Sequence, residues 1–168
     1  MTTYFLDTNA LIKAYIHERG SPWINTTLAK KSSQPRICIS EISRVELPSA
    51  LYKIERIRGY SQALTDTAIN TFARDLRLSA ASRRLRVYEI TPLSDEVLTL
   101  ADALLEKYRS GKPYALRSLD AIQLASAQIA RASLPLAEQG DFIFVTADRQ
   151  LRGVAGVEGL QTVNPEYP

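Results

Sequence analysis

The sequence has almost no sulfur or imidazole: its 168 residues include one cysteine, Cys38, and one histidine, His17. A single cysteine can form no internal disulfide, and its place in the apolar run 37–39 indicates a small buried side chain. The usual zinc sites need several Cys or His ligands, so the chain cannot build one. His17 stands between Glu18 and Arg19 and is expected at the surface.

Long apolar runs and glycine-rich phosphate loops are also absent. No stretch approaches the roughly 18 consecutive apolar residues of a membrane span, no secretory signal is visible, and neither GxGxxG nor a P-loop sequence occurs. We therefore expect a cytoplasmic protein. The length suits a single domain over residues 1–168, and the 45% share of hydrophobic residues is that of a globular core.

Basic residues are concentrated in one part of the chain. Residues 53–86 contain eight basic and three acidic side chains, a net charge of +5, so the remainder carries −2 of the total +3. Such a flank suits a polyanionic ligand. A solvated helix face would show the same pattern.

Short apolar runs alternate with amphipathic segments along the whole chain. Strands are predicted at residues 4–6, 36–39, 87–90, 142–145 and 160–163, the last of them at the edge of the sheet, with helices between them. This order predicts an α/β fold, a three-layer α/β/α sandwich on a mainly parallel sheet of four to five strands. In the helix predicted after the second strand, Ser40 is the expected cap and Pro48 is expected to cause a kink or a restart.

Three aspartates, Asp7, Asp120 and Asp148, stand at predicted helix starts. Asp7 and Asp148 follow predicted strands, and right-handed crossovers bring the carboxyl ends of parallel strands to one edge. Glu46, on or beside the apolar stripe of its helix, is the fourth acid. Four carboxylates converging there would repel one another unless a cation neutralised them, and Mg²⁺ or Mn²⁺ suits oxygen ligands.

The four stretches FLDTNALIK, SEISRVELPSAL, RSLDAIQLASA and FVTADRQL together resemble the PIN-domain ribonucleases, in particular the VapC-type toxins of bacterial toxin–antitoxin pairs. The resemblance covers nearly the whole chain, in order and spacing. It implies a PIN-like fold and a metal-dependent endoribonuclease that cleaves RNA with Mg²⁺, or alternatively Mn²⁺. Pro48 departs from the family pattern, which usually has an ordinary helix former after the glutamate.

Transferred residue by residue, the resemblance makes Asp7, Glu46, Asp120 and Asp148 the catalytic and metal-binding quartet. Asn9 and Thr146 occupy the positions of its supporting polar groups. Arg83, Arg84 and Arg86, in the basic flank, are the candidate RNA contacts. Asp102, a further acid on a helix, is left outside the site.

The resemblance also implies a cognate antitoxin partner and a homodimer. Apolar and aromatic residues exceed what one buried helix face requires, as an interface would explain; they are Leu51, Tyr52, Ile54, Ile57, Tyr60, Tyr108 and Tyr114. All of them could instead belong to the core of a monomer.

Two other functions are compatible with an aspartate after the first strand. One is phosphoryl transfer, but haloacid-dehalogenase-like phosphatases need an Asp where Asn9 stands, and the acidic pair and lysine of receiver domains are missing. The other is a partner-binding module without catalysis, in which the acids are structural.

Overall fold

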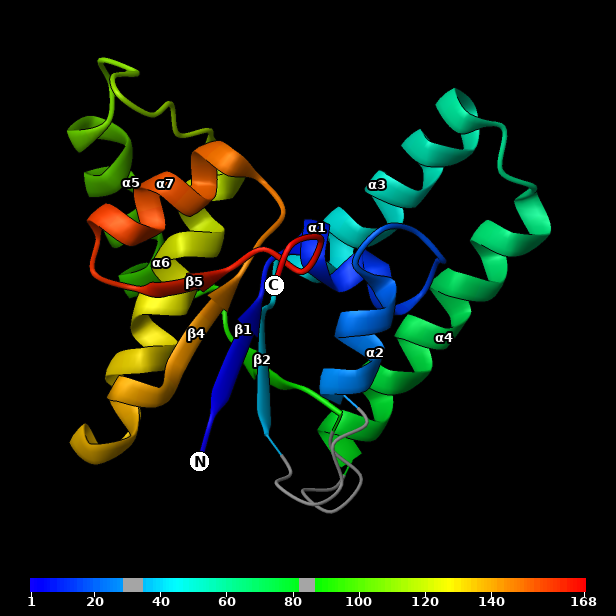
Figure 1. Ribbon diagram of the computed structural model, residues 1–168, viewed down its shortest axis with the longest axis horizontal. Coiled ribbons are helices and arrows are strands. Elements are labelled where there is room, and N and C mark those ends of the chain that lie inside the picture. Colours follow the sequence, from blue (N-terminus) through cyan, green and yellow to red (C-terminus); the bar gives the residue numbers. More distant parts are fainter. Residues whose placement is uncertain (29–34, 82–86) are drawn as a thin grey trace.

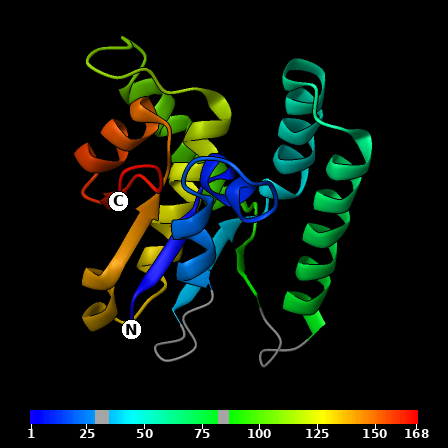
Figure 2. The same ribbon diagram turned by 45° about the vertical axis from the view of Figure 1, so that its right-hand side comes forward.

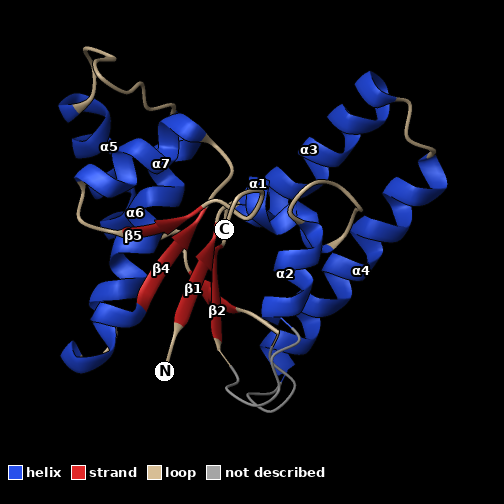
Figure 3. Ribbon diagram, in the orientation of Figure 1, coloured by secondary structure: helices blue, strands red, loops and turns tan. Residues whose placement is uncertain are grey.

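The computed structural model describes residues 1–28, 35–81 and 87–168. Five strands form one sheet, all parallel, in the order β3-β2-β1-β4-β5. Figure 3 shows the strands side by side between two groups of helices. The strands are β1 (Thr3–Leu6), β2 (Arg36–Ser40), β3 (Glu89–Thr91), β4 (Phe142–Val145) and β5 (Gln161–Val163).

Helices connect the strands. They are α1 (Thr8–Leu11), α2 (Ser21–Leu28), α3 (Ser43–Arg58), α4 (Gln62–Ala81), α5 (Asp95–Lys107), α6 (Ser118–Ala132) and α7 (Arg149–Val157), with 3₁₀ turns at Ile12–Ala14 and Leu136–Asp141. None of these described helices combines the length and apolar character that a membrane span requires.

The sheet separates two hydrophobic cores, because successive side chains of a strand point to opposite faces. Phe5 belongs to the core shared with α5, α6 and α7, whereas its neighbour Leu6 belongs to the core shared with α1 to α4. Figures 1 and 2 show these two helical layers on either side of the strands. The predicted three-layer α/β/α sandwich with a mainly parallel sheet is confirmed.

Two features predicted for α3 are not found: a cap at Ser40 and a restart at Pro48. Ser40 does not cap this helix: it remains in β2 opposite Thr91, and its hydroxyl shares a 2.8 Å hydrogen bond with Ser126. The helix does not restart at Pro48 either, since α3 runs through it as one element. Proline removes only one backbone donor, and the packing of Leu47 and Leu51 in the core holds the helix on both sides of it.

The carboxyl ends of β1 and β4 place two polar residues side by side. Leu6 pairs with Val145, so Asp7 and Thr146 leave the sheet together. The Asp7 backbone N–H still donates to the Val145 carbonyl at 3.1 Å. These two residues begin the candidate site.

Candidate active site

Asp7 is a buried carboxylate that caps α1. It is only 1% exposed, and its Oδ1 accepts a 2.7 Å hydrogen bond from the backbone N–H of Ala10. A side-chain oxygen at this position satisfies a helix donor that has no partner within the helix. The other oxygen, Oδ2, accepts from the Thr146 hydroxyl at 2.5 Å.

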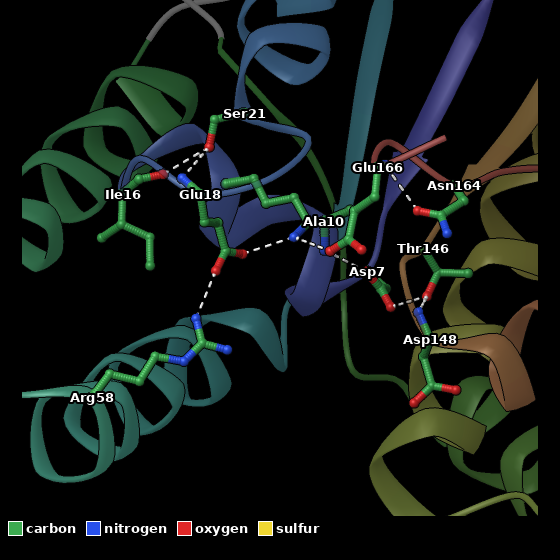
Figure 4. A network of polar contacts seen from close by, with 11 residues as sticks. Asp7, Ala10, Ile16, Glu18, Ser21, Arg58, Thr146, Asp148, Asn164 and Glu166 are labelled. Carbon is green, nitrogen blue, oxygen red and sulfur yellow. Dashed lines mark hydrogen bonds and ion pairs between the residues drawn. The ribbon is translucent and has the colours of Figure 1, made fainter. Parts of the chain in front are cut away.

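Thr146 joins Asp7 to Asp148. Its fully buried hydroxyl donates to Asp7 and accepts from the Asp148 backbone N–H at 3.0 Å. Figure 4 shows it between the two acidic residues. Asp148 in turn caps α7, accepting from the backbone N–H groups of Gln150 at 2.7 Å and Leu151 at 3.0 Å. Thr146 therefore ties the ends of β1 and β4 to the start of α7.

Glu46 lies in the first turn of α3 and is held by side chains from two other helices. Its Oε2 accepts from the Thr8 hydroxyl at 2.7 Å and from the Gln123 amide nitrogen at 2.5 Å. The same nitrogen lies 2.9 Å from the Thr8 hydroxyl and 3.1 Å from that of Ser43. An amide nitrogen has two protons to donate, and the bond to a carboxylate is the stronger kind. Glu46 is thus fixed by its neighbours.

Asp120 is the third residue of α6 and is half-buried. Asp120 and Gln123 are three residues apart, so they share one face of α6. This spacing brings the carboxylate of Asp120 and the amide that holds Glu46 to the same place.

Three of the four predicted acids line one cavity. Asp7, Glu46 and Asp120 border a cavity of about 490 Å³, together with Asn9. Asp148 instead borders an adjoining cavity of about 510 Å³, which Asn9 also lines. Burial raises the pKa of Asp7 to about 7, a shift that bonds from Thr146 and Ala10 oppose and the charges of Asp120 and Asp148 reinforce.

The pKa of Asp120 is also raised. Burial is the main cause, with the charges of Asp148 and Glu46 adding to it and that of Arg117 opposing it. The four acids therefore act on one another electrostatically, although they do not share one cavity.

The donors fit a hard divalent cation by their chemistry. No three His, Cys, Asp or Glu side chains of the described residues lie close enough together to hold one ion. Mg²⁺, however, usually takes only one or two carboxylates and keeps water and substrate phosphates as its other ligands. Asp7 and Asp120, across one cavity, offer such a pair.

Several residues that border the acids were not predicted from the sequence. Thr8 and Gln123 position Glu46, and exposed Lys53 lines both cavities. The sequence does contain a signal for Gln123. In the stretch LDAIQLA it is the only polar residue besides Asp120, and the spacing of three places both on one face of the helix. Lys53 is seven residues after Glu46, which places both on one face of α3.

The other predicted positions fall outside this cluster. Arg83, Arg84 and Arg86 lie outside the described residues, so their role in RNA binding stays a prediction. Asp102 and His17 are exposed and line neither acidic cavity.

A family model of the PIN domain matches residues 4–157. The chain belongs to the PIN domain family. No curated protein matches it in sequence. The family match covers all four acids of the predicted quartet, from Asp7 to Asp148.

Solved structures share the fold of this PIN domain along almost their whole length. VapBC2 from Rickettsia felis, bound to a promoter DNA fragment, is 18% identical over 97% of this chain and 98% of its own, with a TM-score of 0.59. A toxin–antitoxin complex from Klebsiella pneumoniae is 20% identical over 98% and 99%, with a TM-score of 0.57. FitAcB from Neisseria gonorrhoeae is 17% identical over 96% and 97%, with a TM-score of 0.56.

Proposed function

We propose that this PIN domain is a metal-dependent endoribonuclease, the toxin component of a VapC-type toxin–antitoxin pair that acts on RNA in the cytoplasm. The observation that carries the proposal is the cavity at the carboxyl edge of the sheet, which Asp7, Glu46 and Asp120 line. The pKa values of Asp7 and Asp120 are both raised, so ionising these carboxylates is costly without a positive charge, and a bound cation would supply that charge.

Asp7 and Asp120 would hold Mg²⁺ or Mn²⁺, with Glu46 and Asp148 completing the acidic surroundings. When bound, the ion lowers the pKa of a water molecule and offsets the charge on the scissile phosphate. The residues of the chain position these groups: Thr146 orients Asp7, while Thr8 and Gln123 orient Glu46.

Lys53 adds a cation at the border of both cavities. Its exposed ammonium group can hold an RNA phosphate against the acidic centre. The chain contributes no imidazole here, because His17 lines neither cavity.

The similar structures are complexes of toxins with antitoxins, which supports a cognate antitoxin as the partner. Exposed apolar residues of α3 support it too: Val45 and Ile57, which line the cavities of Asp7 and of Asp148, are 62% and 71% exposed, and Tyr52 is 48% exposed. Exposed apolar residues grouped on one helix are typical of interaction surfaces. We also propose that the protein forms a homodimer, because these exposed apolar residues of α3 suit an interface between two copies.

Incubation of the purified protein with end-labelled RNA tests the activity. Cleavage should require Mg²⁺ or Mn²⁺, stop on addition of a chelator, and fall at least about a hundredfold in Asp120→Asn, since a group acting in the transition state is removed. Asp102→Asn is the matched control: it removes an aspartate from an exposed helix position and should cut as the wild type does. Equal rates in the two variants would refute the assignment.

A binding module without catalysis is the second candidate. It is favoured by the hydrogen bonds through which Asp7 and Asp148 cap helices, a sufficient structural role for both. Such a module would cut no RNA under any metal condition, and Mg²⁺ would not change its melting temperature.

A further inference from the structure

A third cavity lies on the far side of α7 from the acidic centre. It measures about 440 Å³. Most of its lining comes from α7, and one residue each comes from the loop before α6 and from β5. The lining residues are Arg149, Arg152, Gly153, Gly156 and Val157 of α7, Tyr114 of the loop, and Thr162 of β5. The α7 positions are spaced by three and four residues, so they form one face of the helix.

The two arginines are available to a ligand. Arg149 is exposed and Arg152 is half-buried, and within the described parts of the chain neither side chain has a hydrogen bond or an ion pair. A guanidinium group presents several donors in a fixed plane that matches the oxygens of a phosphate. Two guanidinium groups on one face of α7, both lining the cavity, form a candidate site for an anion.

Tyr114 supplies an aromatic wall. Its ring lies so close to Gly153 that a Cβ atom at that position would overlap it; only glycine lets the ring rest directly on α7. The loop is also tied to the helix, because the backbone N–H of Ala115 donates to the Gln150 side chain at 3.2 Å. A tyrosine held in this way offers a surface on which a nucleobase can stack.

The cavity is close to the acidic centre along the chain and in space. Asp148 caps α7, and Arg152 is four residues further on, about 6 Å along the helix axis at 1.5 Å per residue. Leu151, between the two arginines in sequence, lines the cavity of Asp7, Glu46 and Asp120. The first turns of α7 therefore stand between the two cavities, and a strand that leaves one can pass over them to the other.

We propose that this cavity binds a nucleotide of the RNA strand beside the scissile phosphate, with its phosphate on Arg149 and Arg152 and its base on Tyr114. This inference rests on the proposed ribonuclease function. It deepens that function by placing part of the substrate path on α7.

Fluorescence anisotropy with a labelled, short single-stranded RNA tests it, using Asp120→Asn as the background so that the RNA stays intact. Arg149→Gln/Arg152→Gln should weaken binding at least about tenfold and reduce the slope of log K against log salt by about 0.7, the value for one lost phosphate contact to a single strand. Arg109→Gln/Lys112→Gln removes the same charge from exposed loop positions that do not line the cavity, and should change affinity less than about twofold.

The tyrosine has its own pair of variants. Tyr114→Ala should weaken RNA binding by about fivefold or more, because it removes a stacking surface, whereas Tyr114→Phe keeps the ring and should bind as the background protein does. Gly153→Ala should act like Tyr114→Ala, since the added methyl group displaces the ring.

The inference is wrong if the arginine pair costs no more affinity than the loop pair in a protein whose wild type cuts RNA. If Arg149→Gln/Arg152→Gln weakens binding of the cognate antitoxin but not of RNA, the cavity serves protein recognition. That result would equally overturn the inference. Failure of the proposed function is seen separately, as a wild-type protein that cuts no RNA with Mg²⁺.

Discussion

Asp7 meets two opposing requirements. Its oxygens satisfy the backbone of α1 and the hydroxyl of Thr146, yet its charge is almost completely removed from water. Ionisation of a buried carboxylate is costly unless a positive charge compensates it. The same residue therefore organises the fold through its hydrogen bonds and destabilises it through its charge.

The stability of the metal-free protein should depend on this group. The pKa of Asp7 rises from 3.8 to about 7 on folding, so between these values the folded protein keeps a proton that the unfolded chain has released. Stability from this group is complete below about pH 4 and is lost as the pH rises through about 7. At pH 8, Asp7→Asn should raise the free energy of unfolding by up to about 4 kcal/mol, at about 1.4 kcal/mol per pKa unit. Urea unfolding at a series of pH values measures this.

Asp102→Asn is again the control, because an exposed carboxylate should give no such gain. Mg²⁺ should raise the melting temperature of the wild type and do so less in Asp7→Asn, since ligand binding to the folded state stabilises it. If Asp7→Asn is no more stable than Asp102→Asn at pH 8, burial of the Asp7 charge is not the dominant effect.

Helix α6 connects the acids of different segments. It carries Asp120, and through Gln123 it holds Glu46 of α3. Gln123→Met preserves much of the side-chain volume but removes this bond, so cleavage should fall more than about tenfold because Glu46 is no longer fixed. The free energy of unfolding should fall by about 1–3 kcal/mol, the usual cost of a lost hydrogen bond to a charged group. Single-turnover cleavage and urea unfolding give the two values.

Gln128→Met provides the comparison on the same helix. Gln128 also donates to a carboxylate, that of Glu158, away from the acidic cavities. This variant should lose some stability and retain full cleavage. Equal activity losses in the two variants would mean that α6 acts through its general stability rather than through the position of Glu46.

The sequence predicted what local signals encode. The strand at 142–145 and the helix start at Asp148 were both confirmed, because an apolar run followed by a capping side chain is contained in a few residues. Thr8 and Gln123 were missed, since their bonds to Glu46 join residues 38 and 77 positions apart. A restart at Pro48, one of the two outcomes predicted there, is not found for the same reason: core packing from distant segments keeps α3 continuous.

The surplus of apolar residues around α3 is smaller than the sequence suggested. Leu51 is 1% and Tyr108 is 8% exposed, so these two belong to the cores. Tyr52 and Ile57 remain on the surface of α3. An interface on α3 would therefore contain fewer apolar residues than the sequence suggested, and each should contribute a larger share of the binding free energy.

We expect the protein to form its homodimer and to bind its antitoxin through the exposed apolar residues of α3. Light scattering of the purified protein is expected to give about twice the 18.7 kDa of one chain, and addition of the cognate antitoxin should increase the mass and stop RNA cleavage. Ile57→Asp should weaken at least one of these associations at least about tenfold, because it places a charge in an apolar contact. Leu136→Asp is matched: Leu136 is 85% exposed in the Leu136–Asp141 turn, away from α3, and its replacement should leave both associations unchanged.

Comparison of the two variants distinguishes association through a specific surface from non-specific aggregation. An exposed leucine and an exposed isoleucine contribute similarly to non-specific aggregation, so loss of mass in both variants would indicate that association is not confined to α3. A monomeric mass at micromolar concentration, with cleavage unaffected by the antitoxin, would contradict both the homodimer and the partner. Loss in Ile57→Asp alone would place the partner on α3, beside the cavity of Asp148 that Ile57 lines, where a bound protein can close the acidic centre to RNA.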